Sequence, residues 1–275
     1  MNIKNMIRKY RNEGYVVADA ESKTAQDIIL SKISKSKFKE HITIKGGVVM
    51  HSISKDKRRA TRDLDLDFIK YSLDDDSIKD FIKLLDNVDD SIHISVDGEI
   101  KPLHHQDYDG KRVLIKIKDE YNNELNTKID IGVHKLFEIE QDDYLFMLDA
   151  LDERVSLLIN SKEQIFTEKL KSLLKLGARS TRYKDLFDFY YLINSCNLDK
   201  EKLIKSINTY IYNDKTMREN NIQDLCDRLS RILNSNLFKN NLNNPKVNWL
   251  DISIDEAISS VLDYLEQLSE EKITV

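Results

Sequence analysis

The sequence predicts an α/β (α+β) protein, with a mixed sheet and covering helices in residues 1–150 and a helical domain in residues 151–275. Between residues 41 and 133, short runs in which apolar and polar side chains alternate indicate strands, and runs of helical periodicity separate some of them. Beyond residue 160 the apolar side chains recur mainly at helical spacing. Only seven Gly and two Pro in 275 residues favour a helix-rich chain with few long loops.

The composition restricts the class of protein and its compartment. Charged residues make up 33% of the chain, and the formal net charge of −5 disfavours a protein that coats nucleic acid but allows local basic patches. No apolar run approaches the roughly 18 residues of a membrane span, and the first residues lack the apolar core of a signal peptide. We therefore expect a cytoplasmic protein without a membrane segment, in which Cys196 and Cys226 form no disulfide.

The elements of the first part follow from the two periodicities. In residues 23–36, Ala25, Ile28 and Ile29 lie on one helical side, which indicates an amphipathic helix over the sheet. In residues 112–118, Val113, Ile115 and Ile117 alternate with polar side chains, which indicates a strand. In chain order we expect helices at 3–13, 23–36, 48–54 and 72–87, and strands at 41–45, 63–68, 92–100, 112–118 and 125–133.

The second part begins with a short strand-like run at 155–159 and then becomes helical. Residues 162–176 carry an apolar stripe that ends at Gly177, a residue type that commonly terminates helices. Further helices are expected at 181–194, 199–212, 220–234 and 254–270, with a polar connector at 241–249.

Carboxylates alternate with apolar side chains in the strand at 63–68. Asp63, Asp65 and Asp67 therefore share one face, while the apolar side chains share the other. Like charges side by side are unfavourable in a strand, and a divalent cation such as Mg²⁺ (or Mn²⁺), which prefers oxygen ligands, would offset this repulsion. One other interpretation remains, a half-exposed edge strand with a solvated acidic face. An EF-hand calcium loop is excluded, because Phe68 stands where that loop requires Gly.

The glycine pair Gly46-Gly47 follows the strand expected at 41–45 and precedes a helical run. Glycines at a strand-to-helix turn allow a phosphate to approach the backbone, and the N–H groups at the start of the helix point toward that phosphate. A phosphate site beside paired carboxylates is what nucleotidyl transfer requires, because metal ions can stabilise the attacking and leaving oxygens. The chain has no Walker A or G-x-S-x-G motif, and its histidines, including His104 and His105, do not have the spacing of a metal site.

These residues resemble the AbiEii-type nucleotidyltransferases, toxins of type IV toxin–antitoxin and abortive-infection systems within the DNA polymerase β-like superfamily. The resemblance rests on K-G-G, a short helix and R-A-T-R-D-L-D-L, which correspond here to Lys45, Gly46, Gly47, Arg59, Thr61, Asp63 and Asp65. Polymerase β-like enzymes often have Gly-Ser where this chain has Gly46-Gly47. The resemblance implies that Asp63 and Asp65 bind the metal, and it leaves Asp67 without a role.

A third carboxylate and a second motif extend the resemblance. Asp130 lies in the strand expected at 125–133, and polymerase β-like enzymes complete the metal site with an acidic residue from a neighbouring strand. An exposed strand aspartate is the alternative interpretation of Asp130. The family also carries E-K on one helix and R-x-x-D-x-x-D on the next, which correspond here to Glu168, Lys169, Arg182, Asp185 and Asp188.

The resemblance implies that Lys169 contacts the nucleotide phosphates and that Asp185 lies at the active site. The alternative is a surface pair between Arg182 and Asp185, which are three residues apart on a helix. The expected catalytic residues are thus Asp63, Asp65, Asp130, Lys169 and Asp185. The expected nucleotide-binding residues are Lys45, Gly46, Gly47, Arg59, Lys169 and Arg182, and we expect the active site between the two domains.

The expected reaction is transfer of a nucleoside monophosphate from an NTP to an acceptor. For an AbiEii-like toxin the acceptor is expected to be tRNA, and an antitoxin encoded nearby is the expected partner. Two alternatives remain: a nucleotidyltransferase that acts on a protein or a small molecule, and a non-catalytic nucleotide-binding protein. A DNA-binding antitoxin is disfavoured by the acidic net charge and by the lack of a convincing helix-turn-helix.

Overall fold

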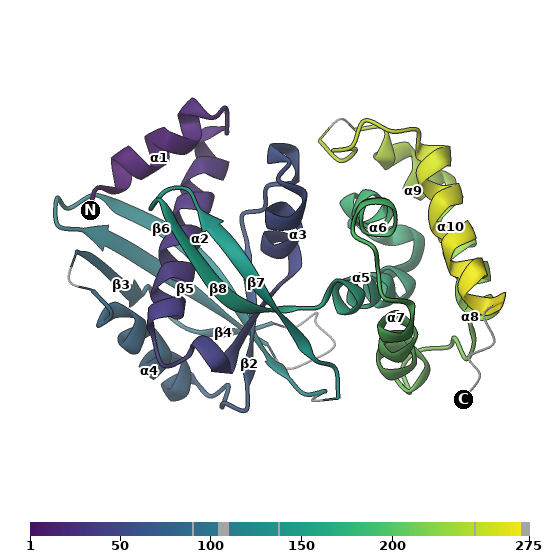
Figure 1. Cartoon of the computed structure of the whole chain (residues 1–275), viewed down its shortest axis with the longest axis horizontal. Coiled ribbons are helices and arrows are strands. Elements are labelled where there is room, and N and C mark those ends of the chain that lie inside the picture. Colours follow the sequence, from purple (N-terminus) through teal and green to yellow (C-terminus); the bar gives the residue numbers. More distant parts are fainter. Residues whose placement is uncertain (90, 104–109, 137, 245, 271–275) are drawn as a thin grey trace. The chain divides into compact units, whose positions relative to one another are not determined.

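The computed structural model describes residues 1–89, 91–103, 110–136, 138–244 and 246–270 (Figure 1). His104 and His105 lie outside the described residues. The chain divides into two compact units, Met1–Asn160 and Ser161–Val275. The first contains a mixed sheet with helices and the second is helical, so the predicted fold class is confirmed.

One sheet of eight strands forms the centre of the first unit, as far as its residues are described. Its strand order is β3-β5-β6-β2-β1-β8-β7, with β4 paired to β5. The β2–β6 and β1–β8 pairs are parallel and the other pairs are antiparallel. The strands are β1 (Ile42–Lys45), β2 (Leu64–Ile69), β3 (Ile92–Val96), β4 (Lys101–Pro102), β5 (Lys111–Asp119), β6 (Glu124–His134), β7 (Gln141–Leu148) and β8 (Glu153–Asn160).

Four helices accompany this sheet: α1 (Ile3–Asn12), α2 (Val17–Lys35), α3 (Gly46–Ser54) and α4 (Asp75–Asp86). Helix α2 packs on β6 and β8 and contacts both α1 and α4 (Figure 1). It begins at Val17, earlier than the expected start at residue 23. Buried Asp27 accepts hydrogen bonds from the Tyr10 hydroxyl and the Ala150 N–H, which links α1, α2 and the turn after β7.

The alternation in β2 creates the two faces that the sequence predicts. Leu64, Leu66 and Phe68 are fully buried. Phe68 packs edge-to-face against Phe81 of α4, with ring centroids 5.3 Å apart, and Phe38 lies 5.1 Å from the same ring. This aromatic cluster fixes α4 against the apolar face of the sheet, so that the aspartates occupy the other face.

The sequence did not reveal strand β7. Its first residues are polar, and only Phe146 and Leu148 near its end are buried. Strand β8 pairs with both β1 and β7, so the sheet continues to Asn160, and the expected domain boundary at residue 150 falls in the turn between these two strands. Strand β3 is shorter than the expected range 92–100 and ends at Val96.

Helices form the described part of the second unit: α5 (Lys162–Leu176), α6 (Lys184–Ser195), α7 (Lys200–Ile207), α8 (Ile222–Leu233), α9 (Asn236–Leu242) and α10 (Ile254–Glu270). Helix α5 has the expected bounds, because the Ser161 side chain caps the Gln164 N–H at its start and Gly177 takes a left-handed φ of 61° at its end. Residues 199–212 do not form one α-helix as expected. The α-helix ends at Ile207, and Asn208–Tyr212 form a π turn directly after it. No helix in the described ranges is long and apolar enough to cross a membrane.

Truncating Phe81 tests the aromatic cluster. Phe81→Ala removes a fully buried ring, so we expect the free energy of unfolding to fall by about 3–5 kcal/mol. Leu145→Ala is the control, because Leu145 is 54% exposed and its truncation should change stability by less than about 0.5 kcal/mol. Urea denaturation measures both changes, and equal losses would contradict this account of the core.

Buried His51 makes stability depend on pH. His51 lies on α3 with its Nε2 atom 3.0 Å from the Tyr15 hydroxyl. Burial, followed by the nearby Lys23 and Arg59 charges, lowers the pKa of His51 from 6.5 to about 4. Between these two values the unfolded chain binds a proton that the folded protein does not, so stability falls as the pH is lowered through this window.

The expected loss from this one group is up to about 3 kcal/mol on going from pH 7 to pH 4. His51→Gln cannot titrate, so its stability should fall less steeply over the same range than that of the wild type. Urea denaturation at several pH values measures both profiles. Parallel profiles would show that His51 does not contribute to the acid sensitivity.

Candidate active site

Four charged residues form a row across four neighbouring strands of the first unit. In the strand register, Lys45 of β1 lies opposite Asp65 of β2, Asp65 lies opposite Asp130 of β6, and Asp130 lies opposite Arg112 of β5. Directly paired residues point to the same face of a sheet, and adjacent strands lie about 4.8 Å apart. The row therefore places two aspartates side by side between two basic residues.

Arg112 binds Asp130 through both carboxylate oxygens. Its Nε donates to Oδ1 at 2.7 Å and its Nη2 donates to Oδ2 at 2.6 Å, a bidentate geometry that is among the strongest side-chain pairings. These hydrogen bonds raise the pKa of Arg112 above its ordinary value. Arg112 is not among the residues expected from the sequence, although its place on the polar side of a strand that alternates at Val113, Ile115 and Ile117 could have indicated it.

Lys45 and Asp67 form a buried ion pair, with Nζ 2.6 Å from Oδ1. Both side chains are buried, so the pair must compensate the loss of hydration of two charges. From the sequence, Lys45 is expected to bind the nucleotide and Asp67 has no role. In the structure, Lys45 neutralises Asp67, which is the next residue along β2 on the same face as Asp65.

The glycine pair brings the start of α3 against the aspartate strand. A Cβ atom at Gly46 would lie 2.6 Å from the Asp65 Oδ2 atom, and Gly46 has a φ of 68°. A Cβ atom at Gly47 would lie 2.8 Å from the Thr61 side chain. Lys45, the N-cap residue of α3, makes no side-chain capping hydrogen bond. The first N–H groups of α3 and the Asp65 carboxylate thus lie close together, which is the arrangement needed to bind a phosphate near a cation.

Asp63 and Arg59 lie in the segment that leads into β2. Asp63 is the residue before the strand, and its half-exposed carboxylate pairs with Lys128 at 2.8 Å. Exposed pairs of this kind contribute little to stability, so a stronger ligand could displace Lys128. Arg59 is buried at the end of the short 3₁₀ turn Lys57–Arg59.

The carboxylates of this face suit a hard divalent cation, because Mg²⁺ and Mn²⁺ prefer oxygen donors. Asp65 and Asp130 are aligned on adjacent strands, and Gly46 leaves room at one oxygen of Asp65. Among the described residues, however, no three His, Cys, Asp or Glu side chains are gathered as a metal-binding group. The set Asp63, Asp65 and Asp130 stays a prediction, since Lys128 and Arg112 hold two of its members.

Within the second unit, Lys169 of α5 lies between two aspartates of α6. Its Nζ atom is 2.5 Å from the Asp185 Oδ1 atom and 2.9 Å from the Asp188 Oδ2 atom, and all three side chains are buried. The E-K and R-x-x-D-x-x-D motifs are therefore adjacent in space. Glu168, by contrast, accepts a hydrogen bond from the Gln164 side chain.

Arg182 contacts the same cluster more weakly. Its Nη1 atom lies 3.9 Å from the Asp185 Oδ2 atom, and its side chain is 50% exposed. Oδ2 of Asp185 is buried and, within the described part of the chain, accepts no hydrogen bond. Asp185 is therefore primarily a partner of Lys169, and the surface pair with Arg182 is secondary.

A mixed sheet in which a glycine pair opens a helix beside aligned aspartates is the arrangement expected of a nucleotidyltransferase. Comparison with protein families gives a match to "Nucleotidyl transferase AbiEii toxin, Type IV TA system" over residues 28–259. The chain belongs to this family of nucleotidyltransferase toxins, as the motifs in the sequence indicated. The matched region includes every candidate site residue of both units. A search of curated proteins found no match.

Replacing Gly46 tests the close approach of α3 to Asp65. Gly46→Ala introduces both left-handed strain and a contact with the Asp65 carboxylate, whereas Gly98→Ala introduces only strain, because nothing lies within 4 Å of its Cβ position. We expect each change to destabilise the protein by about 1–2 kcal/mol through strain, and Gly46→Ala to add about 1–3 kcal/mol. Urea denaturation compares the two variants. Equal losses of stability would show that the Asp65 side chain moves aside without an energetic penalty.

Proposed function

We propose that this protein is a metal-dependent enzyme that transfers a nucleoside monophosphate from an NTP to an acceptor hydroxyl and releases pyrophosphate. One observation carries the proposal: Asp65 and Asp130 are aligned on adjacent strands at the point where Gly46 brings the start of α3 against Asp65. The family match supports nucleotidyl transfer independently of this geometry.

Asp65 and Asp130, with Asp63 beside them, are the residues that would hold Mg²⁺ (or Mn²⁺). When bound, the ion supplies positive charge that stabilises the attacking and leaving oxygens. The backbone N–H groups at Gly46 and Gly47 bind oxygens of the phosphate chain and fix its direction. Lys45 keeps Asp67 neutralised, and this lowers the repulsion that the anionic nucleotide meets on this face. Arg59, buried in the segment before β2, is proposed to help hold the nucleotide.

Arg112 has a specific part in this scheme. While its guanidinium occupies one position on each oxygen of Asp130, its positive charge disfavours a cation at that carboxylate. Arg112 is 38% exposed, so it can turn toward an incoming phosphate and release Asp130 at the moment when the substrate binds. Asp130 then takes the proton of the acceptor hydroxyl. The hydroxyl oxygen bonds to the α-phosphorus, and the bond from that phosphorus to the bridging oxygen of pyrophosphate breaks.

Lys169 is proposed to contact the triphosphate, with Asp185 and Asp188 as its partners before the substrate arrives. The two buried carboxylates fix the ammonium group in place and outweigh its charge, so a phosphate would have to displace one of them to bind Lys169. Arg182, exposed beside Asp185, can contribute a second positive charge.

The proposed acceptor is tRNA, whose modification would stop translation, and the protein would meet both its NTP and its tRNA in the cytoplasm. In this proposal the chain acts as the toxin of an abortive-infection system that limits phage, and an antitoxin encoded nearby neutralises it. The support for the toxin is the family match. The tRNA acceptor rests on the resemblance in the motifs.

An Asp65→Asn variant tests the proposal. The purified protein is incubated with Mg²⁺, with each α-labelled NTP, and with total RNA or whole lysate. We expect the wild type to label RNA and Asp65→Asn to lose about 10²-fold or more of the rate, as happens when a group that stabilises transition-state charge is removed. Induced expression of the wild type, but not of the variant, should arrest growth.

Asp143→Asn is the matched control, since Asp143 is an exposed aspartate of β7 and the chemical change is the same. It should keep both activities, and circular dichroism should show that both variants are folded. Equal labelling by Asp65→Asn and the wild type would refute the catalytic role of Asp65. A label found only in protein would refute the tRNA acceptor and leave nucleotidyl transfer standing.

A further inference from the structure

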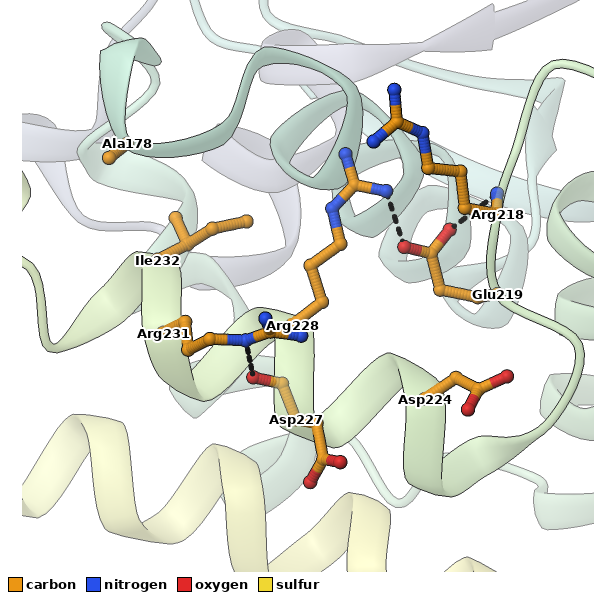
Figure 2. Close-up of a pocket in the computed structure, with 8 residues that line it drawn as sticks. All are labelled: Ala178, Arg218, Glu219, Asp224, Asp227, Arg228, Arg231 and Ile232. Atoms are coloured by element: carbon orange, nitrogen blue, oxygen red, sulfur yellow. Dashed lines mark hydrogen bonds and ion pairs between the residues drawn. The ribbon is translucent and has the colours of Figure 1, made fainter.

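A pocket of about 570 Å³ lies within the second unit (Figure 2). It is formed by the loop before α8, by α8 itself and by the 3₁₀ turn Gly177–Arg179 after α5. Three of its lining residues are arginines, and none belongs to the candidate active site. The lining residues are Ala178, Arg218, Glu219, Asp224, Asp227, Arg228, Arg231 and Ile232.

A buried carboxylate holds one of these arginines in place. Glu219 is only 3% exposed and accepts from the Arg228 Nη1 atom at 2.5 Å and from the Arg218 backbone N–H at 3.1 Å. Arg228 also donates to the backbone carbonyl of Leu174 at the end of α5. A buried acidic group is expensive to desolvate unless it is paired. Here the pairing orients a guanidinium whose remaining N–H groups can serve a ligand in the pocket.

Arg218 and Arg231 add two further guanidinium groups. Both side chains are exposed, and within the described ranges neither forms an ion pair with an acidic side chain. Among the described residues, Arg231 donates to the backbone carbonyl of Asp227. Figure 2 shows the guanidinium groups of Arg218 and Arg228 on the same side of the Glu219 carboxylate.

The lining carries three arginines and three acidic residues, so its formal charge is zero and only the placement of the charges can favour an anion. The Asp224 carboxylate accepts from the Asn220 N–H and the Asn221 side chain at the start of α8, and Asp227 accepts from Gln223. In Figure 2 the Asp227 carboxylate points away from the guanidinium of Arg228. Asp224 and Asp227 keep their charges, but within the described ranges neither forms an ion pair with Arg218 or Arg231, so an anion that binds these two arginines does not have to break such a pair.

We propose that this pocket binds a phosphate group through Arg218, Arg228 and Arg231. The planar guanidinium fork matches the geometry of phosphate oxygens, and Arg228 is already oriented. The phosphate can be a phosphodiester of an RNA strand or a terminal phosphate of a free nucleotide or pyrophosphate. The inference goes beyond the proposed nucleotidyl transfer, because it requires binding only and none of the proposed catalytic residues.

Binding measurements without chemistry test the proposal. In EDTA, so that no transfer occurs, fluorescence anisotropy measures the affinity for a short labelled single-stranded RNA at several salt concentrations. Calorimetry measures the affinities for ATP and for pyrophosphate. The variant is Arg218→Ala/Arg231→Ala. The control is Arg8→Ala/Lys246→Ala, which removes the same charge from exposed positions outside the pocket.

We expect the pocket variant, relative to the control, to lose about tenfold or more in affinity for at least one of these ligands. For RNA, the slope of log K against log salt should also become shallower by about 1.4, since each single-strand phosphate contact contributes about 0.7. A loss for RNA alone assigns the pocket to a phosphodiester. A loss for ATP or pyrophosphate assigns it to a free phosphate chain.

Arg218→Lys/Arg231→Lys keeps the charges without the fork, so it should restore the salt slope but not the full affinity. If circular dichroism shows that the double alanine variant is disturbed, the single alanine variants replace it, each with an expected slope change of about 0.7. Affinities for all three ligands that match those of the control would overturn the proposal. Such unchanged affinities are also the expected result if the arginines bind an acidic protein and not a phosphate.

Discussion

The close approach of Gly46 to Asp65 is the constraint on which the candidate site depends. The 2.6 Å distance from the position of a Cβ atom to the Asp65 Oδ2 atom means that only a residue without a side chain fits there without displacing the carboxylate. Because Gly46 also begins α3, the same contact places helix N–H groups beside an acidic strand. Hydrogen-bond donors for an anion and carboxylate oxygens for a cation thereby lie next to each other.

Electrostatic compensation explains how the sheet tolerates so many acidic residues on one face. Asp67 is neutralised by Lys45 and Asp130 by Arg112, each within the sheet itself. Asp63 has the partly exposed Lys128 as its partner. These pairs differ in how easily a substrate could replace them: the Lys45 pair is buried, whereas Arg112 and Lys128 are partly exposed. This face of the sheet thus has one buried ion pair that a substrate would not replace and two partly exposed ion pairs that it could replace.

In the second unit, buried acidic residues hold a basic residue in place at two positions. Lys169 is held by two buried aspartates, and Arg228 is held by buried Glu219. In both cases an acidic residue orients a basic one in a place where burial alone would disfavour either charge. Such fixed basic groups are suited to phosphate chemistry, because the side chain loses little conformational freedom when the ligand binds. The helical unit is therefore more than a cover for apolar surface.

The sequence alone determined the fold class, the family and the positions of most elements. Local rules were sufficient for the alternation in β2, for the glycine pair, and for α5 between its serine cap and Gly177, because each depends on neighbours along the chain. The aspartates of the β2 segment were expected at the site from the same alternation, whereas Lys169 and Asp185 were expected there from the resemblance to the family. Strand β7 was missed, since its polar start obscures the alternation that ends in Phe146 and Leu148.

Only the tertiary structure decided which charges meet. Arg112 reaches Asp130 across 18 residues of sequence and Lys45 reaches Asp67 across 22, while Asp65 lies beside Asp130 through a parallel strand pair. Likewise, the Arg228–Glu219 pair becomes part of a pocket only when α8 packs near the end of α5. The physical reason is that strand order and register depend on the packing of the whole sheet, whereas local periodicity records only which side of each element is buried.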